Sequence, residues 1–567
     1  MNPGRRFARS FGVTWLLALG VFASGCDRVS DSKSSDPPAS GLVQSGTGKS
    51  AGPVASGDPP PIASASADVL TYHANNARNG LYAAETVLTP KNVDADHFGK
   101  IGFLRVRGLV DAQPLYASNV MVQGSPHKVV FAATEHDMAY AFDAETFQPL
   151  WQTSLLGAGE TTSDNRGCQQ VTPEIGVAST PVIDLKSGPH GTIYLVAMSK
   201  DAQGRYFQRL HALDLATGAE APGSPRPITA SFPGTGANSK NGRVIFDAKQ
   251  YEDRAALLLS NGVIYTTWSS HCDHDPYGSW VIGYNAATLQ QGAVLSLTPN
   301  GTEGAIWMTG DGPAADDAGN IYLLTGNGTF ETKLDSRGFP WQADFGNCFV
   351  KLAMRDNQLR VADYFTMHNT VDESEQDEDL GSGGIVLLPD LQDGAGKIRH
   401  LAMGAGKDQI IYLVDRDSMG KFDPSADRAY QEVASAIGGM EFATPAFFQG
   451  TAYFGAYKDT LKAFPFSSGS LSRLPSSHTA LAFDYPGTTP SISANGLSNG
   501  IVWAVENSIP AALHAYAAGD LSKEIYNSNQ AGTRDQFLNN KFIAPVIADG
   551  KVLVGTPTGV AVFGLLK

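Results

Sequence analysis

The stretch Val129–Trp151, VVFAATEHDMAYAFDAETFQPLW, sets the pattern of this chain. It reads as an apolar strand, a polar turn, a second apolar strand ending at Phe142-Asp143, a turn around Thr146 and a final aromatic residue. Apolar and polar residues alternate with period two and almost no helical periodicity is present, which indicates antiparallel β-strands. A chain that repeats such a unit builds a closed or stacked array, because one unit alone cannot bury its apolar faces.

Variants of this phrase return along the chain, and we count eight. A proline that opens a first strand removes no needed ladder hydrogen bond, and Asp followed by Thr-Gly suits a tight turn between third and fourth strands. The sequence therefore predicts an all-β fold, an eight-bladed β-propeller of four-stranded antiparallel blades, with seven blades as the alternative. The repeats include first strands from Thr180, Thr444, Thr489 and Ala544, second strands at Ile193–Val196, Val263–Thr266, Ile321–Leu324, Ala452–Gly455 and Val552–Gly555, and third strands at Leu210–Gly218, Ile282–Thr288 and Leu513–Tyr516.

The two ends of the repeat array suggest how it closes. The last unit, Lys541–Lys567, supplies only three strands, whereas Phe98–Val106 is a lone strand before the first proline-containing strand, Gln113–Tyr116. We expect Phe98–Val106 to complete the last blade and so remove an exposed sheet edge. A short cap strand is the alternative.

Composition and charge narrow the function classes. The chain has 567 residues with 61 Gly and 32 Pro, which suits many turns, and residues 68–567 are expected to form one propeller. The formal net charge is −15 and no basic residues cluster, so nucleic-acid binding is not expected. Small neutral or cationic partners are weakly favoured.

The N-terminus predicts export. Arg5, Arg6 and Arg9 precede the apolar run Val13–Phe22, and Ala23-Ser24-Gly25-Cys26 follows. Residues 1–25 fit a signal peptide, and the run is too short to span a membrane as a helix. The ending resembles a bacterial lipobox, which implies lipidation at Cys26 and a lipid-anchored protein of the bacterial cell envelope, in the periplasm or on an outer face. Cleavage that frees a soluble protein is the alternative.

Residues 26–67 follow as a tether rich in Ser, Pro, Gly and Ala. They show no periodic apolar pattern and cannot bury enough surface to fold, so we expect disorder.

Three further cysteines, Cys168, Cys272 and Cys348, are widely spaced. In an oxidising compartment one pair could bridge and leave one thiol over, but we favour three unpaired thiols without a function. The cluster His271–Asp275 contains metal-ligand residue types, yet it lacks a second ligand pair at a set spacing, so we favour a metal-free loop.

The blade phrase, with Ala139–Asp143 and the terminal Trp151, resembles the repeats of pyrroloquinoline-quinone (PQQ) dehydrogenases. The segments Tyr72–Gly80 and Leu88–Val93 are similar to the N-terminal signature of those quinoproteins. The resemblance covers essentially the whole ordered chain and implies the propeller fold. Non-enzymatic propellers share the repeat, so the repeat alone does not imply catalysis.

Four places resemble the quinoprotein site. Trp307 in Gly304–Trp307 resembles the tryptophan under the quinone rings, and Asn327 in Leu324–Thr329 resembles the Gly-Asn-Gly calcium ligand. Lys407, followed by Tyr-Leu-Val-Asp-Arg, is similar to the cationic residue that contacts the quinone oxygens.

The fourth place is Asp377 and Asp379 in Gln376–Leu380, which resemble the catalytic aspartate and the second aspartate that serves lanthanide binding in some members. Glu174 in Pro173–Val177 resembles the metal-binding glutamate, but it precedes a first strand whereas the family residue precedes a third strand. The adjacent-cysteine disulfide of many members is absent.

The resemblance implies specific chemistry. PQQ carries three carboxylates, for which Lys407 would supply a local cation. A hard cation, Ca²⁺ or a lanthanide, would take oxygens from Asn327 and Asp379 and act as a Lewis acid. Asp377 would be the general base for the substrate hydroxyl.

Two hypotheses remain. The first is a PQQ-dependent dehydrogenase of the envelope that oxidises an alcohol or a sugar. Its electron acceptor would be a separate partner, because no haem motif Cys-x-x-Cys-His is present. The second is a non-catalytic propeller scaffold that binds proteins or cell-envelope material. If the first holds, the five residues Trp307, Asn327, Asp377, Asp379 and Lys407 should converge on one face of the channel.

Overall fold

Antiparallel sheets are the main regular structure of the described residues. The computed structural model describes residues 67–308 and 311–567, which belong to one unit, Ile62–Lys567. The expectations for the signal peptide, for Cys26 and for the tether as far as residue 66 lie outside these residues. No helix in the described ranges is long and apolar enough to cross a membrane.

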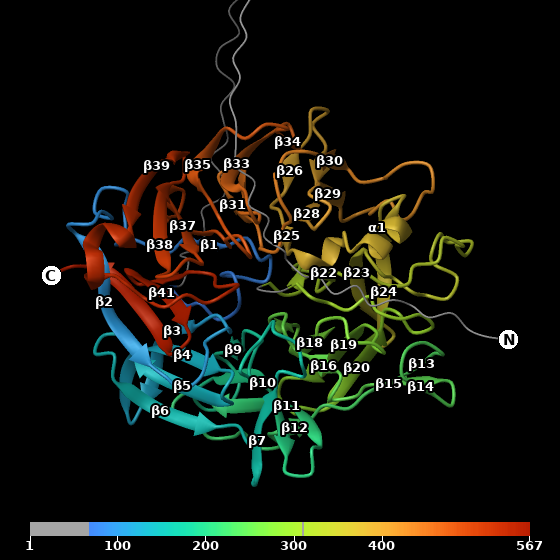
Figure 1. Cartoon of the computed structure of the whole chain (residues 1–567), viewed down its shortest axis with the longest axis horizontal. Coiled ribbons are helices and arrows are strands. Elements are labelled where there is room, and N and C mark those ends of the chain that lie inside the picture. The colour runs from blue at the N-terminus through green and yellow to red at the C-terminus, as the bar shows by residue number, and fades with distance from the viewer. Residues whose placement is uncertain (1–66, 309–310) are drawn as a thin grey trace, which may run out of the picture. The chain divides into compact units, whose positions relative to one another are not determined.

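Eight sheets of this unit contain four or more strands, and Figure 1 shows them following one another in chain order around a common centre. The first four are built on β3 (Leu115–Val122), β4 (Ser125–Thr134), β5 (Met138–Asp143) and β6 (Pro149–Ser154); β9 (Val182–Asp184), β10 (Thr192–Asp201), β11 (Tyr206–Asp214) and β12 (Arg226–Pro227); β17 (Leu258–Ser260), β18 (Val263–Ser270), β19 (Trp280–Asn285) and β20 (Gln291–Ser296); and β21 (Ala314–Ala315), β22 (Ile321–Leu324), β23 (Phe349–Arg355) and β24 (Gln358–Phe365).

The other four sheets continue the same plan. They are built on β25 (Ile385–Leu387), β28 (Leu401–Ala405), β29 (Ile411–Asp415) and β30 (Gln431–Val433); β31 (Ala446–Phe448), β32 (Thr451–Phe454), β33 (Thr460–Ser467) and β35 (Ser477–Ala482); β36 (Ser491–Asn495), β37 (Ser498–Glu506), β38 (Ala512–Ala517) and β39 (Asp520–Asn527); and β40 (Val546–Ala548), β41 (Lys551–Thr556), β42 (Gly559–Leu565) and β2 (Phe98–Arg105).

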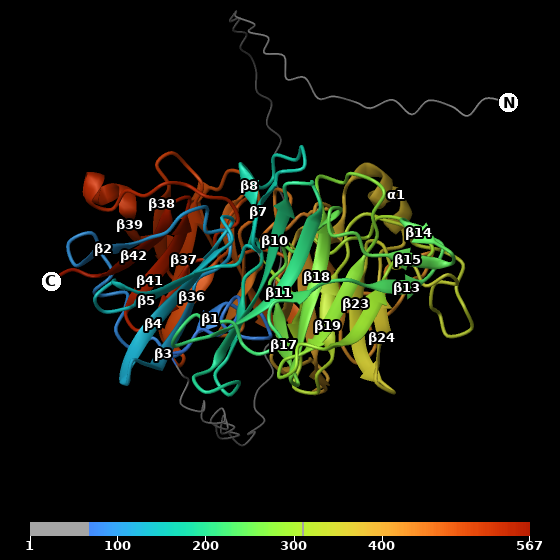
Figure 2. The ribbon, with the colours of Figure 1, turned by 90° about the horizontal axis from the view of Figure 1, so that it is seen from below.

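Shorter elements lie at the edges of these sheets or in the loops between them. They are β1 (Leu81–Tyr82), β7 (Glu160–Asp164), β8 (Glu174–Ile175), β13 (Ser231–Pro233), β14 (Ser239–Lys240), β15 (Arg243–Ile245), β16 (Tyr251–Glu252), β26 (Leu391–Gln392), β27 (Ile398–Arg399), β34 (Ser470–Leu471), the helix α1 (Thr370–Gln376) and the 3₁₀ segments η1 (Leu380–Ser382) and η2 (Ser528–Arg534). Figure 2 shows β7, β8 and α1 at the same edge of the unit.

The predicted turn chemistry between third and fourth strands is confirmed. The side chain at the end of the third strand accepts hydrogen bonds from backbone N–H groups two and three residues later, which fixes a tight turn. The three clearest cases are Asp143 with the N–H of Thr146 at 2.7 Å, Asp214 with that of Thr217 at 3.0 Å, and Asn285 with that of Thr288 at 3.0 Å.

The aromatic end of the repeat joins neighbouring sheets. Trp151 in β6 donates its indole N–H at 2.8 Å to the carbonyl of Leu215, which directly follows β11 of the next sheet. A side chain at Gly218 would meet the Trp151 ring at 2.5 Å, so the glycine of the Thr-Gly turn leaves room for this tryptophan. The apolar core likewise lies between successive sheets, because one buried cluster joins residues of β3 to β5 with residues of β9 to β11.

The expected closure of the array is confirmed. Strand β2 pairs antiparallel with β42, from Phe98 opposite Leu565 to Arg105 opposite Gly559. The order β2-β42-β41-β40 makes β2 the fourth strand of the last sheet. The N-terminal strand therefore covers an edge that the last three strands would otherwise leave open.

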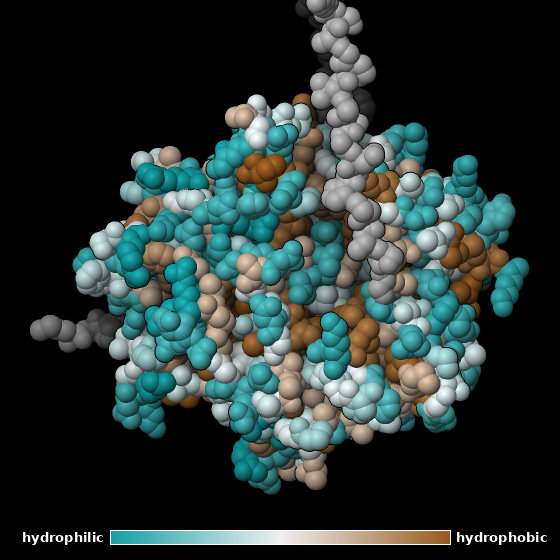
Figure 3. Space-filling model, turned by 180° about the vertical axis from the view of Figure 1, so that it is seen from behind, coloured by the Kyte–Doolittle hydropathy of each residue, from teal (hydrophilic) through white to brown (hydrophobic). Residues whose placement is uncertain are grey.

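The opening segment, residues 69–80, hydrogen-bonds to the first strands of six sheets. Its backbone partners are Tyr116 for Val69, Ile183 for Leu70, Ala315 for Asn76, Leu387 for Ala77, Phe447 for Asn79 and Ile492 for Gly80, all at 2.8–2.9 Å. The segment that resembles a family signature thus ties the sheets together. Figure 3 shows apolar side chains gathered towards the middle of the face seen from behind Figure 1, with polar side chains around them.

Candidate functional site

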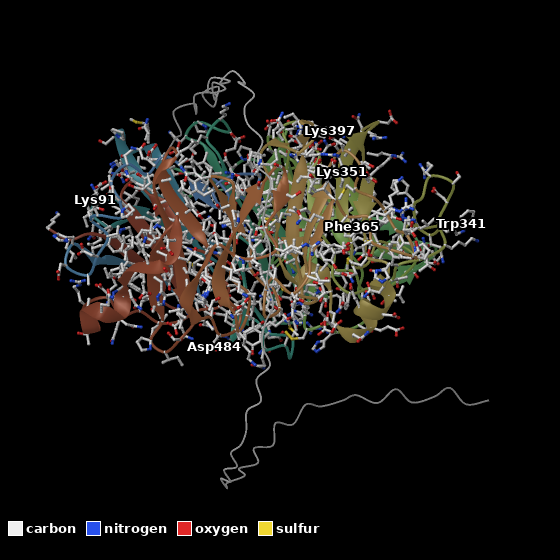
Figure 4. All side chains as sticks on the ribbon, turned by 90° about the horizontal axis from the view of Figure 1, so that it is seen from above. Lys91, Trp341, Lys351, Phe365, Lys397 and Asp484 are labelled. Carbon is white, nitrogen blue, oxygen red and sulfur yellow. A yellow bond between two sulfur atoms is a disulfide. The ribbon has the colours of Figure 1, made fainter. Side chains whose placement is uncertain are left out.

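Four of the five residues proposed for the site line one pocket. They are Trp307, Asn327, Asp379 and Lys407, and the pocket has an open volume of about 480 Å³. The other lining residues are Gln170, Arg254, Asp273, Ser382, Phe442, Tyr485 and Phe542. Figure 4 labels Asp484, the neighbour of Tyr485 in the chain, at one edge of the unit.

Backbone pairing holds the loops of Trp307 and Asn327 together. The N–H of Gly304 donates to the carbonyl of Asn327 at 2.6 Å, and the N–H of Gly326 donates to Ala305 at 2.8 Å. A Cβ at Gly326 would lie 2.7 Å from the Trp307 ring and 3.1 Å from an Asp379 oxygen. The glycine therefore allows the tryptophan ring and the carboxylate to lie close to each other.

Asp377 ends a short helix that the sequence did not predict. Within this acidic run Thr370–Gln376 forms α1, and Asp377 follows it with φ 60° in the left-handed region. Aspartate tolerates this conformation better than most residues. Asp377 Oδ1 accepts a hydrogen bond from Asn327 Nδ2 at 2.7 Å and lies 2.5 Å from Lys407 Nζ.

Asp379 and Lys407 form the buried half of the site. Asp379 is 2 % exposed, its Oδ1 lies 2.8 Å from Lys407 Nζ, and its carbonyl accepts the backbone N–H of Lys407 at 2.9 Å. Burial raises the pKa of Asp379, whereas Lys407 lowers it. Burial also opposes the charge of Lys407, but the carboxylates of Asp379 and Asp377 together raise its pKa above the ordinary value. We infer that the lysine stays charged at neutral pH.

The donor set suits a hard cation held together with an anionic ligand. Among the described residues, Asn327 Oδ1 is buried without a hydrogen-bond partner, and it lies in the same pocket as the Asp379 carboxylate. In those same residues no group of three His, Cys, Asp or Glu side chains is close enough to bind a metal alone. A cation here would therefore use the Asn327 amide oxygen, the Asp379 carboxylate and oxygens of a second ligand.

Asp273 is a pocket residue that the sequence interpretation did not select. It precedes β19, the third strand of its sheet, and accepts a hydrogen bond from the Tyr277 hydroxyl at 2.7 Å. Burial raises its pKa, and Lys407 acts in the opposite direction, so the two side chains sense each other. The signal was present, since Asp273 lies within the cluster His271–Asp275.

Glu174 does not line this pocket. Its Oε1 lies 2.8 Å from His136 Nδ1, and its Oε2 accepts a hydrogen bond from the Thr162 hydroxyl at 2.7 Å. Glu174 lies in the short strand β8, which pairs with β7, and its contacts with His136 and Thr162 account for its position.

Our expectation of three unpaired thiols is wrong. Cys168 and Cys272 form a disulfide with a Cα–Cα distance of 5.5 Å, and Cys348 is a free, buried thiol. Both bonded cysteines lie close in sequence to pocket residues, Cys168 to Gln170 and Cys272 to Asp273.

Known proteins resemble this chain in structure, whereas the sequence comparisons found no match. No protein-family model matches the chain, and no curated protein matches it in sequence. The quinohemoprotein alcohol dehydrogenase from Comamonas testosteroni superposes with a TM-score of 0.58 at 13% identity, over 89% of this chain and 81% of that chain. The chain has the PQQ-like β-propeller fold.

Two further structures agree with this propeller. Quinohemoprotein alcohol dehydrogenase ADHIIG from Pseudomonas putida HK5 gives a TM-score of 0.55 at 12% identity, over 88% of the PQQ-like propeller chain and 80% of its own. A europium-containing methanol dehydrogenase gives a TM-score of 0.51 at 12% identity, over 87% of this chain and 90% of that chain. At these identities the likeness concerns the fold, and any activity of this PQQ-like propeller must be argued from its own pocket.

Proposed function

We propose that this chain is an envelope quinoprotein dehydrogenase that oxidises an alcohol or a sugar, with PQQ and Ca²⁺ or a lanthanide in the pocket of Lys407. One observation carries the proposal. Side chains from three separate loops meet there through direct contacts, because Lys407 contacts both Asp377 and Asp379 while Asn327 donates to Asp377. A coincidental match of short sequence segments would not bring Asn327, Asp379 and Lys407 into one pocket with Asp377 in contact with two of them.

Each residue has a distinct role in this proposal. When bound, PQQ supplies a two-electron acceptor beside a Lewis-acidic cation. Lys407 supplies positive charge for the carboxylates and quinone oxygens of the cofactor, and the half-buried Trp307 supplies an apolar surface for its rings. Asn327 and Asp379 supply oxygens to the cation. Asp377, whose side chain is 68% exposed, can accept the hydroxyl proton of an incoming substrate.

Binding of the cofactor tests the proposal. Titration of the purified protein with PQQ in the presence of Ca²⁺ or a lanthanide is expected to show one binding site by calorimetry, followed by reduction of an artificial dye with an alcohol or a sugar. Lys407→Ala should weaken PQQ binding by about 10- to 100-fold, because a charged hydrogen-bond partner contributes about 1.5–3 kcal/mol.

Lys397→Ala is the matched control. Lys397 is an exposed lysine that Figure 4 labels at the edge opposite Asp484, so its removal changes the net charge without touching the pocket. If the wild-type protein binds no PQQ with either kind of cation, the dehydrogenase proposal falls and a non-catalytic scaffold takes its place. The electron acceptor would be a separate partner.

We also propose that the chain is exported and anchored by lipid at Cys26, which lies outside the described residues. The signal-like N-terminus supports this, and so does the Cys168–Cys272 disulfide, because disulfides persist in oxidising compartments. Cys26→Ser should move the protein from the membrane fraction to the soluble envelope fraction. Unchanged membrane association in that variant would contradict the lipid anchor.

We further propose that the eight larger sheets are eight blades of one propeller. Their strand orders, together with the pairing of β2 and β42, support this count. An experimental structure with seven blades would contradict it.

A further inference from the structure

We propose that the Cys168–Cys272 disulfide positions the pocket, holding Gln170 and Asp273 in place so that the cation affinity depends on this bond. The cysteines are positioning residues here, because they act through neighbours that line the pocket. The cation in this inference rests on the proposed function. The positioning of the two loops by the disulfide does not depend on that function.

The disulfide joins two loops that are far apart in the sequence. Cys168 lies between β7 and β8, Cys272 lies between β18 and β19, and 104 residues separate them. Each loop contributes one side chain to the pocket within two residues of its cysteine, namely Gln170 and Asp273. The bond therefore fixes two walls of the same pocket relative to each other.

Gln170, in the Cys168 loop, accepts hydrogen bonds from two positively charged side chains. The side-chain carbonyl of Gln170 accepts a hydrogen bond from Arg254 at 2.9 Å, and its backbone carbonyl accepts one from Lys541 at 2.8 Å. Arg254 also lies over the ring of Phe542 at 5.5 Å, and both of these side chains line the pocket. Movement of Gln170 would release Arg254 from its acceptor in the pocket wall.

The Cys272 loop holds Asp273 in an unfavourable backbone conformation. Cys272 and Asp273 are consecutive non-glycine residues with φ 49° and 52°, in the left-handed region. Such a pair persists only where surrounding structure fixes it. The disulfide supplies one constraint, and the hydrogen bond from Tyr277 to Asp273 supplies another. Together they keep the Asp273 carboxylate in the pocket, where Lys407 affects its pKa.

A merely structural disulfide would also stabilise the fold, because it restricts the unfolded chain. A loss of stability therefore does not test the inference. The test needs a signal from the pocket itself, and Trp307 provides one, since a tryptophan next to a bound terbium ion sensitises its luminescence.

Terbium alone is the probe in the test, and its luminescence is followed on excitation of tryptophan. We expect the Cys168→Ser/Cys272→Ser protein and the reduced wild-type protein to bind terbium at least about tenfold more weakly than the oxidised protein, and reoxidation to restore the affinity. Val552→Ala is the control, because it removes buried volume in β41 and lowers stability without touching either loop. Equal terbium affinity in the oxidised, reduced and double-serine proteins overturns the inference.

Amide hydrogen exchange separates this inference from the proposed function. In the ligand-free double-serine protein we expect at least about tenfold faster exchange in residues 271–277, with little change in β41. If the oxidised wild-type protein binds no terbium, the proposed cation site is wrong. The hydrogen-exchange experiment then still tests whether the disulfide positions the loop. Unchanged exchange of residues 271–277 overturns that role.

Discussion

Replacing Asp377 with alanine is expected to lower kcat of the PQQ- and cation-loaded protein by about 10²–10⁴-fold, while PQQ affinity changes little. The carboxylate is 68% exposed and is oriented by Lys407 at 2.5 Å and by Asn327 at 2.7 Å. An oriented, accessible base acts on the proton that moves in the transition state and contributes little to binding of the cofactor. Dye-coupled steady-state kinetics and calorimetry with PQQ measure the two quantities separately.

Glu375→Ala is the control for this substitution. Glu375 is an exposed carboxylate in α1, two residues before Asp377, and it does not line the pocket. Its removal changes the charge of the acidic run by the same amount and should leave kcat within about threefold. If Asp377→Ala and Glu375→Ala have the same kcat, Asp377 is not the base. If Asp377→Ala also loses PQQ, the residue holds Lys407 in place and has no separate catalytic role.

Much of the fold could be predicted because its signals are local and repeated. Period-two alternation, proline at first strands and Asp-Thr-Gly turns each follow from backbone chemistry within a few residues. The closure by Phe98–Arg105 could be predicted by counting strands, since the last unit had three and the lone strand needed a partner. The role of the segment 69–80 could not be predicted from the sequence, because its hydrogen-bond partners lie in six sheets along the whole chain.

The candidate site was predictable where a loop directly follows or precedes a strand. Asn327 comes three residues after β22, and Lys407 comes two residues after β28, so equivalent positions in successive sheets bring them to one edge. The short helix α1 was not predictable, because seven residues with an acidic sequence are a weak helix signal.

Asp273 escaped prediction for a different reason. Its loop is fixed by a bond to Cys168, more than 100 residues away, and three cysteines do not specify which pair forms. Glu174 shows the converse case. Its short segment resembles a family site, but its side chain contacts His136 and Thr162 and does not line the pocket.

Arg78→Ala is expected to give the largest loss of stability, about 3–5 kcal/mol. Arg78 is fully buried and donates to the carbonyls of Tyr72, Leu257 and Pro313 at 2.9–3.2 Å. It also donates to the Thr71 hydroxyl at 2.7 Å. Its removal leaves these acceptors buried, and it takes away the positive charge that faces Asp311. Denaturant unfolding at pH 7 measures the loss, and a loss below about 1 kcal/mol would contradict this account.

The pH dependence of this loss tests whether the charge matters or only the hydrogen bonds. Burial raises the pKa of Asp311 to about 7, and Arg78 holds it below the value that burial alone would give. Between the ordinary aspartate pKa of about 3.9 and this value, the folded state retains a proton that the unfolded state has lost. Stability therefore falls as pH rises through this window, by up to about 1.4 kcal/mol for each pH unit.

In Arg78→Ala the pKa of Asp311 rises further, so the window extends above pH 7. We expect the stability difference between this variant and the wild-type protein to grow from pH 6 to pH 8. At pH 5, where Asp311 is protonated in both folded proteins, the difference should reflect the lost hydrogen bonds and packing.

Asp311→Asn removes the titrating group but keeps an oxygen that can accept the Ile385 N–H, a hydrogen bond that Asp311 makes at 2.7 Å. Arg78→Ala/Asp311→Asn should therefore lose the extra pH dependence and recover part of the stability at pH 8. If the double variant is as unstable at pH 8 as Arg78→Ala, the cost comes from the unpaired carbonyls alone, and the charge of Arg78 contributes nothing.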